Sequence, residues 1–130
     1  MDKFDLIVIG SGPGGYVAAV RAAELGLKTA IVEKDQLGGV CLNYGCIPSK
    51  SLLKNAEVVR TLRNDSELYG INGKDFEADF GVAVDRSRKV SKRLNQGVNF
   101  LMKKNKIKVY EGTAAFVDKS SVEVQLNDRS

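Results

Sequence analysis

The feature that most constrains the fold of this chain is a glycine-rich turn between an apolar segment and a helix-forming segment. Residues 4–9 (FDLIVI) are an apolar run of the kind that is buried in parallel sheets. The run leads directly into residues 10–15 (GSGPGG), and residues 14–25 predict a helix rich in small side chains. Residues 28–33 predict a second strand that ends in an acid, Glu33. The order of strand, glycine turn, helix, strand and acid predicts a βαβ unit with parallel strands.

The glycines of this turn have the spacing G-x-G-x-x-G, which suggests a task for each of them. Gly10 would form the tight turn, Gly12 would let the backbone approach a pyrophosphate, and Gly15 would let the helix pack closely on the strand. The helix N-terminus can donate N–H groups to phosphate oxygens, and Glu33 can accept hydrogen bonds from ribose hydroxyls. The pattern predicts a dinucleotide site, with a ligand-free glycine turn as the alternative. Glu33 disfavours a ribose 2′-phosphate and hence NADPH, but the glycines do not distinguish FAD from NAD.

Both cysteines of the chain lie in one segment, residues 38–50 (GGVCLNYGCIPSK). In a regular helix the Cα atoms of Cys41 and Cys46 would lie about 7.5 Å apart along the axis, whereas a disulfide tolerates up to about 7 Å. A disulfide would therefore require a bend, which Gly45 with a positive φ would permit. Pro48 suits the first turn of a helix, whose N-terminus would stabilise a Cys46 thiolate. Two inert, reduced thiols remain compatible with these residues, but without histidine or a third cysteine a zinc site is disfavoured.

The thirteen residues from Gly38 to Lys50 resemble, without a gap, the redox motif of the flavin disulfide oxidoreductases, and most of all that of the dihydrolipoamide dehydrogenases. Tyr44 fills the one position of the motif that we expect to vary. The resemblance implies a truncated, Rossmann-type FAD-binding domain, with FAD at the N-terminal glycine turn. It also implies that Cys41 is the exposed thiol that exchanges with a substrate dithiol. Cys46 would lie against the flavin, and Lys50 would lie beside the reactive edge of the ring.

The resemblance therefore implies two catalytic residues, Cys41 and Cys46, and no metal ligand. It also implies a set of residues at the cofactor, in which Gly112 and Ala114 belong to a strand end whose backbone meets the adenine. The expected cofactor-binding residues are Gly10, Gly12, Pro13, Gly14, Gly15, Glu33, Lys34, Gly38, Gly39, Val40, Cys41, Lys50, Gly112 and Ala114.

The resemblance further implies an activity and partners for a full-length protein. Such enzymes are homodimers that oxidise the dihydrolipoamide of lipoyl-bearing subunits in 2-oxo acid dehydrogenase complexes, through a disulfide and FAD to NAD. They are several times longer than this chain, and they carry an NAD-binding domain and a dimerisation domain that supplies a catalytic histidine. This chain has no histidine and no second G-x-G-x-x-G. We therefore expect residues 1–130 to be the N-terminal part of an FAD-binding domain, without turnover by itself.

Two alternatives accompany this interpretation. The chain could instead be a fragment of a related reductase of the mercuric or glutathione reductase type. It could also be a folded, non-catalytic module that binds no flavin. The sequence Cys-Ile-Pro-Ser-Lys followed by Ser-Leu-Leu, at residues 46–53, favours the lipoamide enzyme.

The remainder of the chain predicts an α/β fold. Apolar side chains at helical spacing predict helices over residues 50–63 and 81–105, with a polar loop over residues 64–79 between them. Residues 106–111 predict a third strand, and residues 116–126 predict the first arms of a small antiparallel meander. In the family's sheet the first strand also pairs with a strand beyond Ser130, so its edge would be unpaired here.

The distribution of charged and apolar residues indicates which kinds of partner the chain can bind: nucleic acid, protein or membrane. Residues 86–108 hold nine Lys and Arg and no Asp or Glu. Phe100 is the one large aromatic side chain among them, whereas a nucleic-acid surface uses several for stacking. We therefore expect no nucleic-acid partner, and we assign this basic segment to a contact with another subunit or domain. No apolar run approaches a membrane span and the first residues do not form a signal peptide, which predicts a cytoplasmic protein with no membrane partner.

Overall fold

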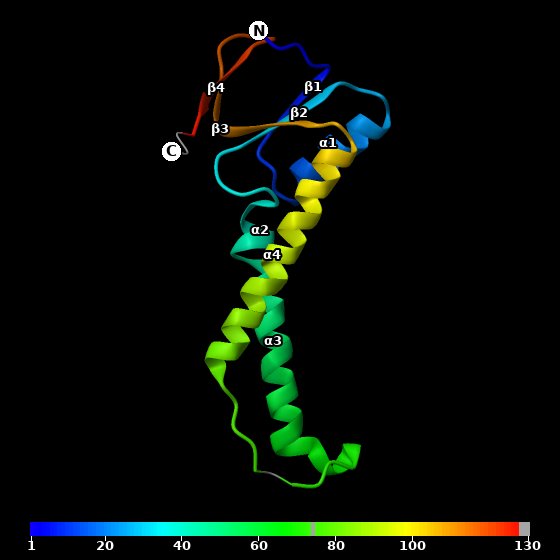
Figure 1. Ribbon diagram of the computed structural model, residues 1–130, viewed down its shortest axis with the longest axis vertical. Helices are drawn as coiled ribbons and strands as arrows, with labels where there is room; N and C mark the ends of the chain where they lie inside the picture. Colours follow the sequence, from blue (N-terminus) through cyan, green and yellow to red (C-terminus); the bar gives the residue numbers. More distant parts are fainter. Residues whose placement is uncertain (74, 128–130) are drawn as a thin grey trace.

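The computed structural model describes residues 1–73 and 75–127, and its centre is a four-stranded sheet (Figure 1). The strands lie in the order of the sequence: β1 (Leu6–Ile9), β2 (Thr29–Glu33), β3 (Lys108–Phe116) and β4 (Val122–Leu126). β1, β2 and the first half of β3 are parallel, whereas β4 runs antiparallel to the second half of β3. The predicted α/β class, with a Rossmann-type parallel sheet that continues into antiparallel arms, is confirmed. In the described part of the chain, β1 is an edge strand, as expected.

Four α-helices accompany the sheet: α1 (Pro13–Glu24), α2 (Gly39–Asn43), α3 (Cys46–Arg60) and α4 (Phe80–Lys104). The three long helices lie where the sequence predicts them, while the short helix α2 was not predicted. The expected loop over residues 64–79 is wrong for its first part, because a π-helical turn (Thr61–Asp65) and a 3-10 turn (Ser66–Tyr69) follow α3. No glycine or proline interrupts this stretch before Gly70, which adopts φ +68° and ends it. Position 74 of the expected loop lies outside the described residues.

The core lies between the sheet and the helices α1, α2 and α4. β2 is buried along its whole length, and it lies between β1 and β3 in contact with α1. The buried apolar side chains of the core are Ala19, Ile31, Leu37, Leu42, Val98, Met102 and Ile107. This burial of apolar surface holds the helices against the sheet. Among the described residues, none of the helices is long and apolar enough to cross a membrane.

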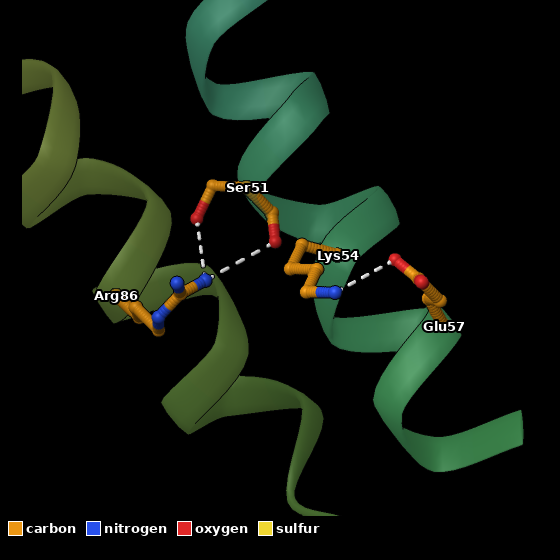
Figure 2. Close-up of polar contacts among 4 residues, drawn as sticks. All are labelled: Ser51, Lys54, Glu57 and Arg86. Atoms are coloured by element: carbon orange, nitrogen blue, oxygen red, sulfur yellow. Dashed lines mark hydrogen bonds and ion pairs between the residues drawn. The ribbon is translucent and has the colours of Figure 1, made fainter. Parts of the chain in front are cut away.

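α3 and α4 lie side by side and project from the sheet as an arm (Figure 1). Arg86 on α4 links them, because its Nη1 donates to the backbone O of Ser51 at 3.3 Å and to Ser51 Oγ at 3.0 Å (Figure 2). Lys54 and Glu57 form an ion pair at 3.0 Å on α3, which adds little stability because both side chains are exposed (Figure 2). The start of α3, which carries Cys46, is thus held by α4.

β3 continues as one strand through the segment where the sequence predicts a strand end. Gly112 makes this continuity possible, because a Cβ at this position would collide with the backbone O of Gln125 on β4. Ala114 pairs with Val124 in the same antiparallel ladder. The expectation that Gly112 and Ala114 mark a strand end is therefore wrong: both lie inside β3, and the glycine is needed for the close approach of β4.

The packing of α4 predicts the effect of a core substitution. Met102 is 1% exposed and belongs to the core. We expect Met102→Ala to lower the free energy of unfolding by about 2–5 kcal/mol, because the cavity left behind collapses only in part. Lys103→Ala, at the exposed neighbouring position, is the control, with an expected change within about 0.5 kcal/mol. Urea unfolding followed by circular dichroism measures both, and equal losses would contradict this packing.

Candidate functional site

The glycine turn lies at the carboxyl end of β1, beside the carboxyl end of β2. Gly10 adopts φ +90° and donates its N–H to the backbone O of Val32 at 2.8 Å, which confirms the predicted tight turn. A Cβ on Gly15 would collide with the backbone O of Gly10, the residue that follows β1, so the predicted close packing of the helix on the strand requires a glycine here. An added Cβ on Gly12 or Gly14 would meet no atom within 4 Å. The N-terminus of α1 is therefore open to a ligand on this side.

Glu33 is the last residue of β2, and its carboxylate is held against the turn. Glu33 Oε2 accepts hydrogen bonds from Ser11 N at 2.9 Å and Ser11 Oγ at 2.5 Å, and Glu33 Oε1 accepts one from Asp35 N at 2.9 Å. Burial alone raises the pKa of Glu33, but the hydrogen bonds from Ser11 and Asp35 outweigh it and hold the pKa below its usual value. The carboxylate is therefore ionised and fixed in orientation, as an acceptor for ribose hydroxyls has to be.

Ser11 joins this turn to the segment that precedes α2, and the sequence analysis missed it. Its side chain is fully buried. Ser11 Oγ accepts a hydrogen bond from Gly38 N at 3.1 Å, and the same N–H lies 3.0 Å from the backbone O of Ser11. A Cβ on Gly39 would lie 2.7 Å from Gly12 Cα, so α2 begins in direct contact with the turn. Ser11 was missed because it occupies an unspecified position of the glycine motif.

Two asparagines hold α2 in place. Asn43 Nδ2 donates to the backbone O of Leu37 at 3.1 Å and of Gly39 at 2.9 Å. Asn95 on α4 donates to the same Leu37 O at 2.7 Å and lies 3.3 Å from Asn43 Oδ1. The five-residue helix begins after Gly38, which adopts φ +98°. A helix this short depends on such tertiary contacts, which the sequence analysis did not anticipate.

Cys41 in α2 and Cys46, the first residue of α3, form a disulfide with Cα atoms 4.7 Å apart. The predicted bend is present, but the predicted positive φ at Gly45 is wrong, since this residue adopts φ −118° and ψ −110°. The chain turns because α2 ends and α3 begins in a new direction. Gly45 is still needed, because a Cβ would lie 3.1 Å from the backbone O of Val40 and 3.3 Å from Cys41 Cα.

The two cysteines differ in their surroundings. Cys46 is exposed and Cys41 is half-buried, which is the reverse of the expected order. The reason is that Cys41 lies inward, towards the other helices, whereas Cys46 lies at the open N-terminus of α3. Lys50 is exposed one helical turn after Cys46, on the same face of α3. Val40 is 72% exposed, so an apolar side chain next to the disulfide has no cover.

Cys41 borders an apolar groove of about 570 Å³ between α1, α2, α3 and α4. Among the residues that the structure describes, no charged side chain lines this groove. Its walls include Pro13, Tyr16, Ile47, Leu94, Phe100 and Leu101. The sequence analysis missed the groove because its lining residues come from four separate helices, and only the fold brings them together beside the disulfide.

The remaining expected cofactor residues lie at the carboxyl ends of β2 and of the parallel half of β3. Glu111 is in register with the last residue of β2, and Gly112 follows it. Asn127 bridges this edge, donating its Nδ2 to Lys34 O and its backbone N–H to Glu111 O, each at 2.9 Å. Ala114 lies two residues further along β3. Throughout the described part of the chain, no three His, Cys, Asp or Glu side chains are grouped so that they could hold a metal ion.

A comparison with known families assigns the class of this chain. The model of the pyridine nucleotide-disulphide oxidoreductase family matches residues 4–129. The chain therefore belongs to this family of oxidoreductases, and the resemblance to flavin disulfide oxidoreductases on which the sequence analysis relied is confirmed.

Within the family, the chain is similar to dihydrolipoyl dehydrogenases. It is 56% identical over 128 residues to the dihydrolipoyl dehydrogenase of Mycobacterium tuberculosis, covering 98% of this chain and 27% of that protein. It is 51% identical over 123 residues to that of Corynebacterium glutamicum, covering 95% of this chain and 26% of that protein. The chain thus spans about a quarter of the length of these curated relatives.

A solved structure shows the same architecture. It is the Cu(II) complex of the HOCl-induced flavoprotein disulfide reductase RclA from Escherichia coli, with a TM-score of 0.77 and 28% sequence identity. The match covers 96% of this chain and 25% of that one.

The lowered pKa of Glu33 predicts a contribution to stability that depends on pH. A carboxylate with a lower pKa in the folded chain stabilises the fold above its unfolded pKa, and this contribution is lost as pH falls through the folded pKa. We expect Glu33→Gln to lower the free energy of unfolding at about pH 7. On acidification below the usual glutamate pKa of 4.5, the free energy of unfolding should fall less in this variant than in the wild-type chain. Glu24→Gln, which removes an exposed ion pair, is the control. Urea unfolding across pH measures the effect, and a wild-type profile for Glu33→Gln would contradict it.

Proposed function

We propose that this chain is the FAD-binding, disulfide-bearing part of a dihydrolipoamide dehydrogenase. The observation that carries this proposal is the contact between α2 and the glycine turn. Because Gly39 lies directly on Gly12, a dinucleotide held at the turn would lie beside the helix that carries Cys41. The similarity to proteins named dihydrolipoyl dehydrogenase supports the same assignment.

The residues around the turn fit the ADP half of FAD. The first N–H groups of a helix have no partner within the helix, so the open N-terminus of α1, with Pro13 at its first position, suits a pyrophosphate. The ionised carboxylate of Glu33 suits the ribose hydroxyls. We assign the adenine to the backbone near Lys34, Gly112 and Ala114, at the same edge of the sheet.

The surface around the disulfide fits the flavin ring. Val40 and Cys46 are exposed, and Gly38 and Gly39 leave their segment without side chains that would fill the space. A ring placed here would cover the exposed valine. Lys50 on the same helix face as Cys46 would offer a cation to a reduced, anionic ring. When bound, FAD supplies a two-electron acceptor for the dithiol of the protein.

The disulfide would take two electrons from a dithiol substrate by exchange. A substrate thiolate attacks Cys41 Sγ, a mixed disulfide forms, and Cys46 leaves as a thiolate that the N-terminus of α3 stabilises. The second substrate thiolate then attacks the substrate sulfur of the mixed disulfide and releases Cys41. The substrate leaves as a disulfide with its two protons removed, and the protein holds both electrons as a dithiol.

The apolar groove beside Cys41 favours dihydrolipoamide over glutathione disulfide as the substrate class. Its lining carries no charged side chain, which suits an aliphatic chain that ends in an amide. Glutathione disulfide carries several charges, and their burial in such a groove would be unfavourable. The groove therefore supports the lipoamide enzyme over a related reductase of the glutathione type.

We assign the other parts of the reaction to the rest of a full-length protein. The chain contains no histidine, so a histidine general base has to come from outside it. The NAD-binding and dimerisation domains belong there too, as do the contacts of the homodimer and of the lipoyl-bearing subunits of 2-oxo acid dehydrogenase complexes. The basic segment, residues 86–108, is suited to one of these protein contacts. We also propose a cytoplasmic location, and no turnover with NAD by this chain alone.

Selectivity between two flavins tests the cofactor assignment. We expect the chain to bind FAD and to bind FMN at least tenfold more weakly, because FMN lacks the ADP half that the turn and Glu33 would hold; about tenfold corresponds to one or two lost polar contacts. Fluorescence titration of each flavin measures the two affinities. Glu33→Gln should weaken FAD binding and leave FMN binding unchanged. Equal affinities for FAD and FMN would show that residues 10–15 and Glu33 do not form the site, and a chain that binds neither would be the non-catalytic module.

Alkylation of the reduced chain tests the roles of the two cysteines. We expect FAD to slow the labelling of Cys46, because the ring would cover it, and to leave the labelling of Cys41 from the groove almost unchanged. Mass spectrometry of peptides resolves the two sites. ADP is the matched control, since it can occupy the turn without a ring over the disulfide. Equal protection by FAD and ADP, or stronger protection of Cys41 than of Cys46, would contradict the assigned roles.

A further inference from the structure

The hydroxyl of Ser11 lies at the junction of three segments that are distant in the sequence. Ser11 Oγ donates to Glu33 Oε2 at 2.5 Å and accepts from Gly38 N at 3.1 Å. One small side chain thus connects the glycine turn, the end of β2 and Gly38, the residue that precedes α2. Ser11 is fully buried, so no solvent competes for these two bonds.

The contacts continue from Ser11 to the disulfide. Gly38 is the N-terminal cap residue of α2, and its φ of +98° sets the direction in which the helix starts. Cys41 is the third residue of this helix, and its disulfide partner is the first residue of α3. At the other end, Glu33 is the acid that we assign to the ribose. The only side chain between the carboxylate and the start of α2 in this path is therefore that of Ser11.

We propose that Ser11 is a positioning residue that couples ligand binding at Glu33 to the dithiol–disulfide equilibrium of Cys41 and Cys46. A ribose hydroxyl that binds Glu33 changes how strongly this carboxylate accepts from Ser11 Oγ. The hydroxyl in turn sets how firmly Gly38 N–H, and with it the start of α2, is held on the turn. The coupling rests on the proposed dinucleotide site, and it adds to that proposal a connection between the site and the disulfide.

A buried serine can also be a local packing residue, and the chain contains an example for comparison. Ser87 is 2% exposed, and its Oγ donates to Val84 O at 2.7 Å within the same helix. Its hydrogen bond spans three residues, whereas those of Ser11 Oγ span 22 and 27 residues. Removal of either hydroxyl leaves a methyl group in a buried site, but of these two serines it is Ser11 whose hydroxyl bonds the turn to the segment that precedes α2.

The experiment uses ADP, which offers the ribose and pyrophosphate without redox chemistry. The chain is equilibrated with reduced and oxidised glutathione, with and without ADP, then quenched by alkylation and analysed by mass spectrometry. In this exchange the two cysteine thiols lose two electrons and two protons to form the disulfide, and one glutathione disulfide becomes two glutathione molecules. The variants are Ser11→Ala, Glu33→Gln and the matched control Ser87→Ala. ADP affinity is measured on the same samples by calorimetry.

We expect Ser11→Ala to weaken ADP binding roughly fivefold and to lower the equilibrium constant for disulfide formation roughly fivefold, the size of one lost hydrogen bond. The backbone bonds from Ser11 N to Glu33 and from Gly38 N to Ser11 O can persist in this variant, so the change isolates the hydroxyl. ADP should shift the disulfide equilibrium of the wild-type chain and of Ser87→Ala, but not that of Ser11→Ala. By linkage, the redox state should change the ADP affinity by the same factor.

The outcomes separate this inference from the proposed function. If ADP binds the wild-type chain but shifts its disulfide equilibrium no more than that of Ser11→Ala, the coupling is wrong and the dinucleotide site stands. If Ser11→Ala and Ser87→Ala behave alike in every measurement, Ser11 is a packing residue only. If neither ADP nor FAD binds the wild-type chain, the proposed function fails. In that case the contacts from Glu33 through Ser11 to Gly38 are still tested without a ligand. Glu33→Gln should shift the disulfide equilibrium when Ser11 is present, and it should not shift that equilibrium when it is combined with Ser11→Ala.

Discussion

The close contact between the start of α2 and the glycine turn is the constraint on which the rest of the site depends. Gly39 lies so near Gly12 that a side chain would not fit between them, and Ser11 receives the N–H of Gly38. The turn itself is anchored to β2 through Gly10 N–H. A displacement of α2 would therefore have to displace the turn or break buried hydrogen bonds. This is why the glycine turn and the disulfide, which come from different parts of the chain, lie together in one site.

The helices α3 and α4 hold the second half of the site. Arg86 attaches α4 to Ser51 in the second turn of α3 (Figure 2). Asn95 attaches α4 to the segment before α2. Because α4 contacts both helices that carry a cysteine, it fixes the geometry between α2 and α3. It also supplies Leu94 and Phe100 to the apolar groove beside Cys41. The walls of the groove and the geometry of the disulfide thus depend on the same helix.

Most errors of the sequence analysis concern residues whose conformation depends on distant partners. The positive φ expected at Gly45 is absent, since the reason for glycine there is the nearness of Val40 O and not a left-handed backbone. Gly112 was expected to end a strand, whereas it lies inside β3, and a Cβ at this position would collide with the backbone of β4. The short helix α2 has no periodicity of its own to detect, and it is held by Asn43 and Asn95. The prediction of each of these features requires knowledge of which atoms lie near the residue in the folded chain.

The sequence by itself determined the βαβ unit, the long helices, the glycine turn and the position of the acid, because these follow from local spacing of apolar residues and glycines. It also placed Cys41 and Cys46 in one short segment, where a disulfide would require a bend between them. Only the tertiary structure decided that the carboxylate of Glu33 bonds to Ser11 and that α2 rests on the turn. It also decided which cysteine is more exposed. These depend on contacts between segments more than 20 residues apart, whose geometry is set by the packing of helices on the sheet.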